Sequence, residues 1–164
     1  MTDPLSLDWE PEALAAFEAV RAWSLANAEL NQHLAAWTGL PTTDANALGN
    51  VVWAAEGGEP LSPAQLARRI GMTSGATTVL LNRLEAAGHV VRTRESTDRR
   101  RVTLRPSPEA REAARAFTAF SGQEIAATLR ESTPADLRVV AGFMGRLAAA
   151  AAAGNARLQE RGRA

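Results

Sequence analysis

Two neighbouring stretches of this sequence carry side chains suited to binding a polyanion. Residues 73–83 place small and polar side chains on one side of a helical pattern, and residues 98–101 read Asp-Arg-Arg-Arg. Guanidinium groups donate hydrogen bonds to phosphate oxygens, while amides and hydroxyls pair with base edges. The residue types therefore indicate a nucleic-acid ligand, provided that the fold brings both stretches to one surface.

Short capping signals predict the two helices that would position the first stretch. Ser62 and Gln65 form a capping-box pattern at the start of one helix, and Gly71 is suited to end it in a left-handed conformation. Thr73 is placed to cap the next helix, which we expect over residues 74–87 and which Gly88 ends. Its expected buried stripe recurs at three- and four-residue spacing and consists of Thr77, Leu80, Leu81 and Leu84.

A basic hairpin is expected directly after these helices. Residues 90–94 and 101–104 alternate as strands do, and the polar residues 95–100 join them. Helix, tight turn, helix and basic hairpin is the order of a winged helix-turn-helix. The second helix would enter the major groove of DNA, and the hairpin would reach the adjacent minor groove.

The predicted DNA contacts fall into two groups. The first, on the second helix, consists of Thr73, Ser74, Gly75, Thr78, Val79, Asn82 and Arg83. The second, in the wing, consists of Asp98, Arg99, Arg100 and Arg101. We expect Asn82 to pair with adenine, Arg83 to contact a phosphate, and Asp98 to hold an arginine in place. The alternative for each group is an ordinary solvent-exposed polar surface.

Long helices are predicted on either side of this winged helix-turn-helix, which we call the head. The apolar spacing indicates helices over residues 9–37, 42–55 and 107–131, and a last helix from 133 that Gly154 and Asn155 loosen and that frays from residue 161. The fold class is mostly α with a small β-hairpin wing. Residues 42–105 are expected to form the DNA-binding domain, and 1–41 with 106–164 a helical dimerisation region. The long apolar stripes favour pairing with a second copy, and a two-fold dimer matches a palindromic site.

Charge is segregated along a chain whose formal net charge is zero. Residues 1–59 hold nine acids and one arginine, a net charge of −8, whereas residues 60–105 hold nine arginines and three acids, a net charge of +6. This distribution argues for one focused phosphate-binding patch rather than non-specific binding along the whole surface.

Composition excludes several other classes of site. The chain has no cysteine, so disulfides and thiolate metal sites are excluded. His33 and His89 are the only histidines, and no metal-ligand spacing or glycine-rich phosphate loop accompanies them. We therefore expect no cofactor, no metal and no enzymatic activity. No signal peptide and no uninterrupted apolar run long enough for a bilayer is evident, so a cytoplasmic location without membrane contact is expected.

Aromatic residues concentrate in the N-terminal third. Trp37, Trp53, His33 and the isolated cation Arg21 form a candidate pocket for a flat organic acid or phenol. Packing in the core or a dimer interface is the simpler explanation of the tryptophans, and an ion pair with a nearby acid is the simpler explanation of Arg21.

Two motifs resemble the MarR family of bacterial transcription regulators. Residues 97–104, Thr-Asp-Arg-Arg-Arg-Val-Thr-Leu, are similar to the family's wing, which carries Asp-Arg-Arg. Residues 82–88, Asn-Arg-Leu-Glu-Ala-Ala-Gly, resemble the end of its recognition helix, with Asn82 in place of an acid. The resemblance covers nearly the whole chain. It implies a homodimeric regulator, usually a repressor, that binds a pseudo-palindromic double-stranded operator and is often released by a small-molecule effector.

A different class of function stays open on the sequence alone. Val79 and the small residues Gly75 and Ala76 leave room for a winged helix that binds a protein partner instead of DNA. The arginine-rich wing favours the DNA-binding interpretation.

Overall fold

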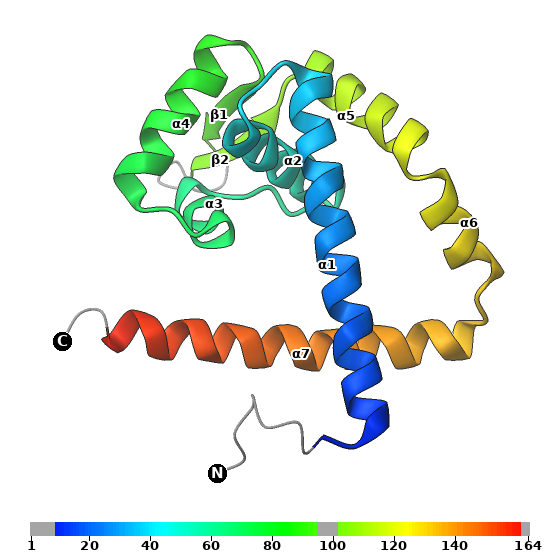
Figure 1. Ribbon diagram of the computed structural model, residues 1–164. Coiled ribbons are helices and arrows are strands. Elements are labelled where there is room, and N and C mark those ends of the chain that lie inside the picture. The colour runs from blue at the N-terminus through cyan, green and yellow to red at the C-terminus, as the bar shows by residue number, and fades with distance from the viewer. Residues whose placement is uncertain (1–8, 95–101, 162–164) are drawn as a thin grey trace. The chain divides into compact units, whose positions relative to one another are not determined.

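The computed structural model describes residues 9–94 and 102–161 of the chain and divides it into two compact units, residues 1–121 and 122–164 (Figure 1). The helices of the first unit are α1 (Pro11–Thr38), α2 (Thr42–Glu56), α3 (Pro63–Ile70), α4 (Ser74–Ala86) and α5 (Pro108–Ser121). Its strands are β1 (Val90–Arg94) and β2 (Val102–Pro106). The second unit contains α6 (Gln123–Glu131) and α7 (Pro134–Arg161). This confirms the predicted fold class, mostly helical with a two-stranded wing.

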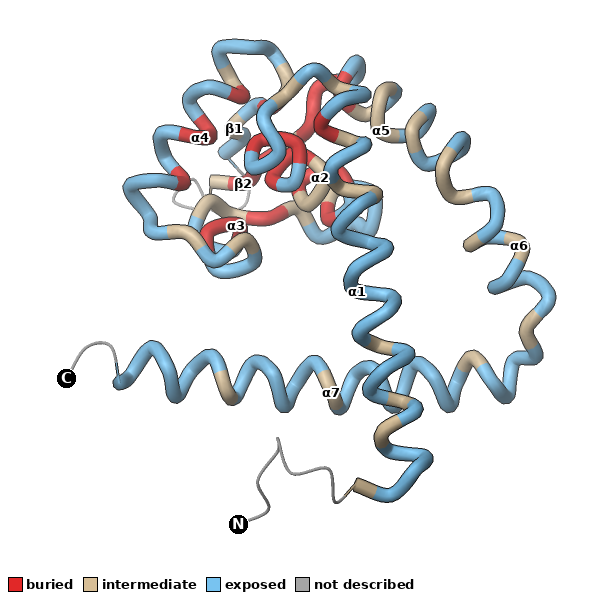
Figure 2. Tube along the Cα trace, viewed as in Figure 1, coloured by how far each residue is buried: buried red, intermediate tan, exposed pale blue. Residues whose placement is uncertain are grey.

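The core of the first unit lies between α2, α3, α4 and the two strands, where the buried residues gather (Figure 2). β1 and β2 pair antiparallel, with Val90 opposite Pro106 and Arg94 opposite Val102. The Leu104 amide donates to the Leu61 carbonyl at 2.8 Å, which ties the segment before α3 to the hairpin. The predicted stripe of α4 is buried, and the largest fully buried side chains of the unit are Leu66, Leu80, Leu81, Leu84, Leu104, Val51 and Val90, with Thr77 and Thr103.

The predicted caps hold α3 and α4 in place. The Ser62 hydroxyl accepts from the Gln65 amide at 3.3 Å, and the Gln65 side chain accepts from the Ser62 amide at 2.7 Å. Gly71 adopts φ +69° at the end of α3, and the Thr73 hydroxyl accepts from the Ala76 amide at the start of α4. Helix α2 differs from these two, because Pro41 occupies its N-cap position and no side chain caps it.

One expectation about the flanking helices needs correction. The single helix predicted over residues 107–131 is two helices, because the backbone leaves helical geometry at Gly122 (φ −103°), a residue with low helix propensity. The apolar stripes of α1 are largely uncovered within the single chain, where Ala35 is the one buried residue among positions 11–38. Phe17 and Trp37 are each 48% exposed.

Helix α5 is fastened to α2 by one acid and two arginines. Glu56, near the end of α2, lies 2.8 Å from Nε of Arg111 and 2.9 Å from Nη2 of Arg115. The hydrogen bond from Arg115 lowers the pKa of the Glu56 carboxyl, and the charges of Arg115 and Arg111 act in the same direction against partial desolvation. The contact fixes the start of α5 against the winged helix.

The second unit has no buried residue among its described positions 122–161. By length and composition α7 is apolar enough to cross a membrane, with a mean hydropathy of 1.3 over 18 residues. The sequence of α7 shows no uninterrupted apolar run of that length, because arginines interrupt the pattern. Arg146 lies near the middle of α7, and an arginine at the centre of a bilayer is costly, so this one helix is weak evidence for a membrane span.

The two glycines that flank the turn between α3 and α4 provide a matched test of this local structure. No atom lies within 4 Å of a Cβ added at Gly71 or at Gly75, so only backbone conformation distinguishes the two positions. Gly71→Ala should lower the free energy of unfolding by about 1 kcal/mol, because φ +69° is strained for alanine. Gly75→Ala should raise it by up to about 1 kcal/mol, because alanine favours the helix.

Urea titration followed by far-ultraviolet circular dichroism measures both values. Equal destabilisation by the two substitutions would contradict the assigned left-handed conformation at Gly71.

Candidate nucleic-acid interface

The outer face of α4 is the first part of the candidate interface. It lies opposite the buried stripe, and its exposed members are Ser74, Gly75, Thr78, Val79 and Asn82. Val79 is 56% exposed, although it is apolar. A valine on such a face can contact a thymine methyl group or a sugar, and it offers no hydrogen bond to a base.

The N-terminal half of α4 already uses part of its hydrogen-bonding capacity. The Thr73 hydroxyl accepts from the Ala76 amide at 3.3 Å, and the Thr78 hydroxyl donates to the Ser74 carbonyl at 2.8 Å. Thr78 consequently presents lone pairs outward, which suit a base amino group better than a phosphate oxygen. Because no side chain projects from Gly75, the backbone of this turn is open to a close approach.

Arg83, at the C-terminal end of α4, is held by an acid of α2. Its Nε and Nη2 atoms donate to the two carboxylate oxygens of Asp44 at 3.0 and 2.6 Å. The Asp44 side chain is 3% exposed and that of Arg83 is 55% exposed. These hydrogen bonds, more than the charge of Asp44, raise the pKa of the Arg83 guanidinium. The phosphate contact of Arg83 stays a prediction. The contact that the structure shows is the one with Asp44, which anchors α4 on α2.

A second arginine reaches α4 from the wing. Nη2 of Arg92, in β1, donates to Oδ1 of Asn82 at 3.0 Å, and Nη1 lies 3.1 Å from Oε2 of Glu85. Sequence reasoning did not single out Arg92 or Asp44. The alternation of β1 contained a signal for Arg92, because it places residue 92 on the same side as buried Val90, which packs in the core beside α4.

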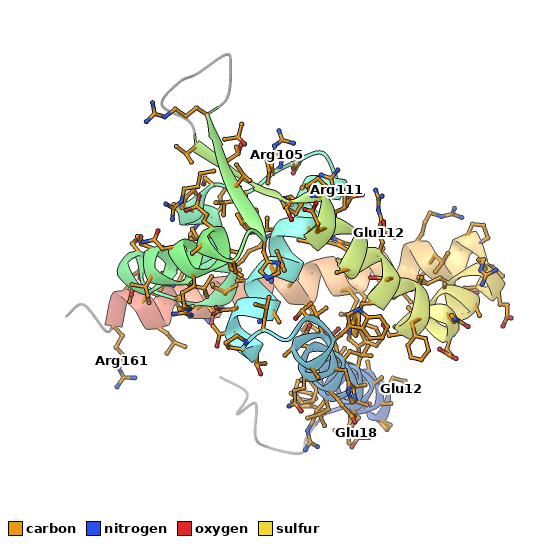
Figure 3. The ribbon with its side chains drawn as sticks, turned by 90° about the horizontal axis from the view of Figure 1, so that it is seen from above. Glu12, Glu18, Arg105, Arg111, Glu112 and Arg161 are labelled. Carbon is orange, nitrogen blue, oxygen red and sulfur yellow. The ribbon has the colours of Figure 1, made fainter. Side chains whose placement is uncertain are left out.

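The predicted wing contacts Asp98, Arg99, Arg100 and Arg101 lie outside the described residues. The strands that lead to them are described, and the pair formed by Arg94 and Val102 is the last before the loop. Arg105 projects from β2 and Arg111 from α5, whereas Glu12 and Glu18 project from α1 (Figure 3). Within the first unit, the acids of α1 are therefore separated in sequence and in structure from the basic side chains around the hairpin.

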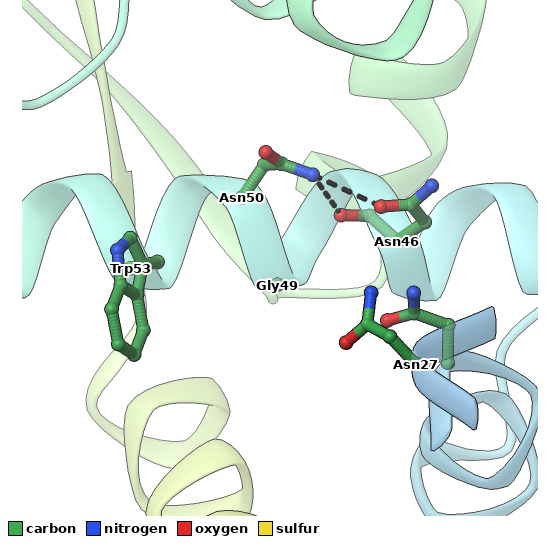
Figure 4. Close-up of a pocket in the computed structure, with 6 residues that line it drawn as sticks. Asn27, Asn46, Gly49, Asn50 and Trp53 are labelled. Carbon is green, nitrogen blue, oxygen red and sulfur yellow. Dashed lines mark hydrogen bonds between the residues drawn. The ribbon is translucent and has the colours of Figure 1, made fainter. Parts of the chain in front are cut away.

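A shallow groove between α1 and α2 is the candidate ligand site. Its volume is about 340 Å³, and its lining consists of Asn27, Asn31, Asn46, Gly49, Asn50 and Trp53 (Figure 4). The Asn50 amide donates to the backbone and side-chain oxygens of Asn46 at 2.9 and 3.0 Å. This leaves the Asn50 carbonyl and the Asn46 amide group available for a ligand. The lining contains no charged side chain.

The structure does not bring the four predicted pocket residues together. Trp53 lines the groove, but Arg21, His33 and Trp37 do not. Trp37 packs instead against Phe117 and Phe120 of α5, with ring centroids 5.9 Å apart in each pair. His33 lies 3.9 Å from Glu29 on an exposed turn of α1. Across positions 9–94 and 102–161, no group of three or more acids and histidines is arranged to hold a metal ion.

Comparison with known proteins places this geometry in a family. Residues 38–101, from the last residue of α1 to the residue before β2, match the MarR family model. This segment of the chain is a MarR family domain. Its winged helix-turn-helix is therefore shared with relatives as well as visible in the fold.

Two relatives illustrate the extent of the sequence similarity. A segment of 89 residues is 29% identical to YcgE, an uncharacterised HTH-type transcriptional regulator of Bacillus subtilis, and covers 54% of this chain and 58% of that protein. A segment of 54 residues is 44% identical to the HTH-type transcriptional regulator TtmR of Methylorubrum extorquens, covering 33% of this chain and 26% of TtmR. The alignment thus spans little more than half of the length of the first relative and about a quarter of the second.

A solved structure extends the similarity to most of the fold. The transcriptional regulator BldR of Sulfolobus solfataricus superposes with a TM-score of 0.57 and 25% sequence identity, over 84% of this chain and 95% of that protein. The flanking helices are therefore part of the shared architecture, together with the winged helix.

Replacing Arg83 tests whether its ion pair with buried Asp44 stabilises the fold. Arg83→Ala leaves a buried carboxylate without its partner, so the Tm should fall by about 5 °C or more. Asp44→Asn should lower the Tm by less, because the amide oxygen still accepts a hydrogen bond from Arg83 and the Arg83 side chain reaches solvent. Differential scanning calorimetry gives both Tm values. The account of α4 anchoring is wrong if Arg83→Ala leaves the Tm unchanged.

Proposed function

We propose that this chain is a sequence-specific DNA-binding transcriptional regulator that acts in the cytoplasm. The observation that carries the proposal is the exposed polar face of α4, held by Asp44 and Arg92, beside the strands that lead to the arginine-rich residues 99–101. This arrangement supplies a helix for the major groove and basic side chains for the neighbouring minor groove.

A homodimer on a pseudo-palindromic operator is the second part of the proposal. The helices that flank the head leave large apolar side chains uncovered, including Trp23 at 49% exposure on α1 and Val139 at 73% on α7. Covering such surfaces with a second copy removes apolar area from water and presents two α4 helices to DNA. The half-site centres should then lie about 10 base pairs apart. Repression as the mode of action follows from the family resemblance.

The competing class of function is a winged helix that binds a protein and not DNA. The net charge of +6 over residues 60–105 counts against it, because a protein partner does not require a focused cationic centre. Selection of bound fragments from randomised duplex DNA separates the two classes. Enrichment of a palindromic motif supports the regulator, and the absence of any enriched sequence would favour the protein-binding module.

Arg100→Ala tests the proposed contribution of the wing. Removing one phosphate-neutralising charge should weaken binding to the selected operator and reduce the slope of log K against log salt concentration by about 1. Fluorescence anisotropy from 50 to 200 mM salt measures this slope. Arg130→Ala, on α6 and outside the winged helix, is the matched control and should leave it unchanged. An unchanged slope in Arg100→Ala would remove the wing from the interface.

We further propose that a small phenolic or other flat aromatic effector binds in the groove between α1 and α2. Trp53, 77% exposed, offers a flat ring, and the asparagine amides hydrogen-bond a hydroxyl group. The lack of a cation in the groove favours a neutral phenol over a carboxylate. Binding across α1 and α2 would bias the position of the head and so release DNA.

Tryptophan fluorescence tests this ligand class. Titration with phenol and with benzoate should quench the wild-type chain more strongly with phenol, and Trp53→Phe should lose most of the response. Trp23→Phe, on α1 outside the groove, is the control and should retain it. A response that persists undiminished in Trp53→Phe would exclude the groove as the site.

A further inference from the structure

Arg92 connects the root of the wing to two positions on the recognition helix. Its guanidinium lies 3.0 Å from Oδ1 of Asn82 and 3.1 Å from Oε2 of Glu85, and the side chains of Arg92 and Glu85 are 31% and 30% exposed. Positions 82 and 85 are one helical turn apart, so a single planar group contacts both. The contact with Glu85 holds the guanidinium in place, and the held guanidinium orients Asn82.

The chemistry of the guanidinium decides which end of the Asn82 amide faces outward. Arginine has donors and no acceptor, so the atom that faces it must be the carbonyl oxygen of Asn82. The amide nitrogen of Asn82 consequently points away from Arg92 with both of its hydrogens. Asn82 is exposed, and no other hydrogen bond of its side chain occurs in the described part of the chain.

We propose that Arg92 is a positioning residue for base recognition and that it makes Asn82 a hydrogen-bond donor toward the major groove. The inference rests on the proposed DNA-binding function. In the major groove guanine presents two acceptors, N7 and O6, whereas cytosine presents the N4 donor. The base facing Asn82 is therefore guanine in preference to cytosine. The two-bond pairing with adenine expected from sequence is disfavoured, because it requires the carbonyl oxygen that Arg92 engages.

The position of Arg92 links this recognition to the wing. Arg92 belongs to β1, and two residues farther along the same strand Arg94 forms the last residue pair of the β ladder, with Val102. A displacement of the hairpin would withdraw the guanidinium from Asn82. The orientation of Asn82 therefore depends on the position of the hairpin.

The experiment compares base preference in four variants by selection from randomised duplex DNA and by anisotropy on single-base operator variants. The variants are Asn82→Ala, Arg92→Ala, the double variant and Arg94→Ala. Arg94 is the matched control, because it lies on the same strand and forms no hydrogen bond with α4 within the described residues. Calorimetry checks that each variant folds. Arg92→Lys, which keeps the positive charge, is included in case Arg92→Ala does not fold.

The wild-type chain should prefer guanine to cytosine about tenfold at one base pair of each half-site. Asn82→Ala, Arg92→Ala and Arg92→Lys should each reduce this preference to within about twofold, and the double variant should lose no more. Arg94→Ala should weaken binding to all sequences alike and retain the preference.

Two results would overturn the inference separately from the proposed function. The first is full base preference in both Arg92 variants, and the second is a loss in the double variant equal to the product of the single losses. Failure of the proposed function has a different signature, since the wild-type chain would then enrich no sequence at all.

Discussion

The structure depends on how helix α4 is held. Its inner stripe packs in the core, but packing alone leaves a helix free to slide or rotate by small amounts. Two arginine contacts remove this freedom: Asp44 of α2 receives both hydrogen bonds of Arg83, and Arg92 of β1 reaches Asn82 and Glu85. Because the Asp44 carboxylate is almost fully buried, it must keep its partner, and this requirement fixes the C-terminal half of α4 relative to the domain.

Local signals made the winged helix predictable. The capping box at Ser62, the left-handed Gly71 and the cap at Thr73 act over three or four residues, so their geometry follows from sequence alone. The stripe of α4 follows from helical periodicity in the same way. The ion pair between Asp44 and Arg83 joins positions 39 residues apart, and no local rule selects one acid of α2 as its partner. Arg92 was missed for a different reason, because the alternation of β1 places it on the side of Val90 but does not name its partners on α4.

Outside the head, sequence patterns predicted elements better than burial. The apolar stripes of α1 were expected to be covered, yet Phe17 and Trp37 remain about half exposed in the single chain. The break at Gly122 was missed because a single glycine inside a helical pattern is often tolerated. The pocket was predicted from residue type, and three of its four residues lie elsewhere. Residue type alone is a weak signal, because Trp37 packs against α5 and His33 lies on an exposed turn. The asparagine groove had no sequence signal, since its residues come from two helices.

The central claim is that the outer face of α4 lies in the major groove of a palindromic operator. Methylation interference with dimethyl sulfate tests it most directly, because guanine N7 lies in the major groove and adenine N3 in the minor groove. The account predicts that N7 methylation blocks binding at guanines in two clusters, with centres about 10 base pairs apart. Interference confined to adenine N3, or binding indifferent to N7 methylation throughout the operator, would contradict it.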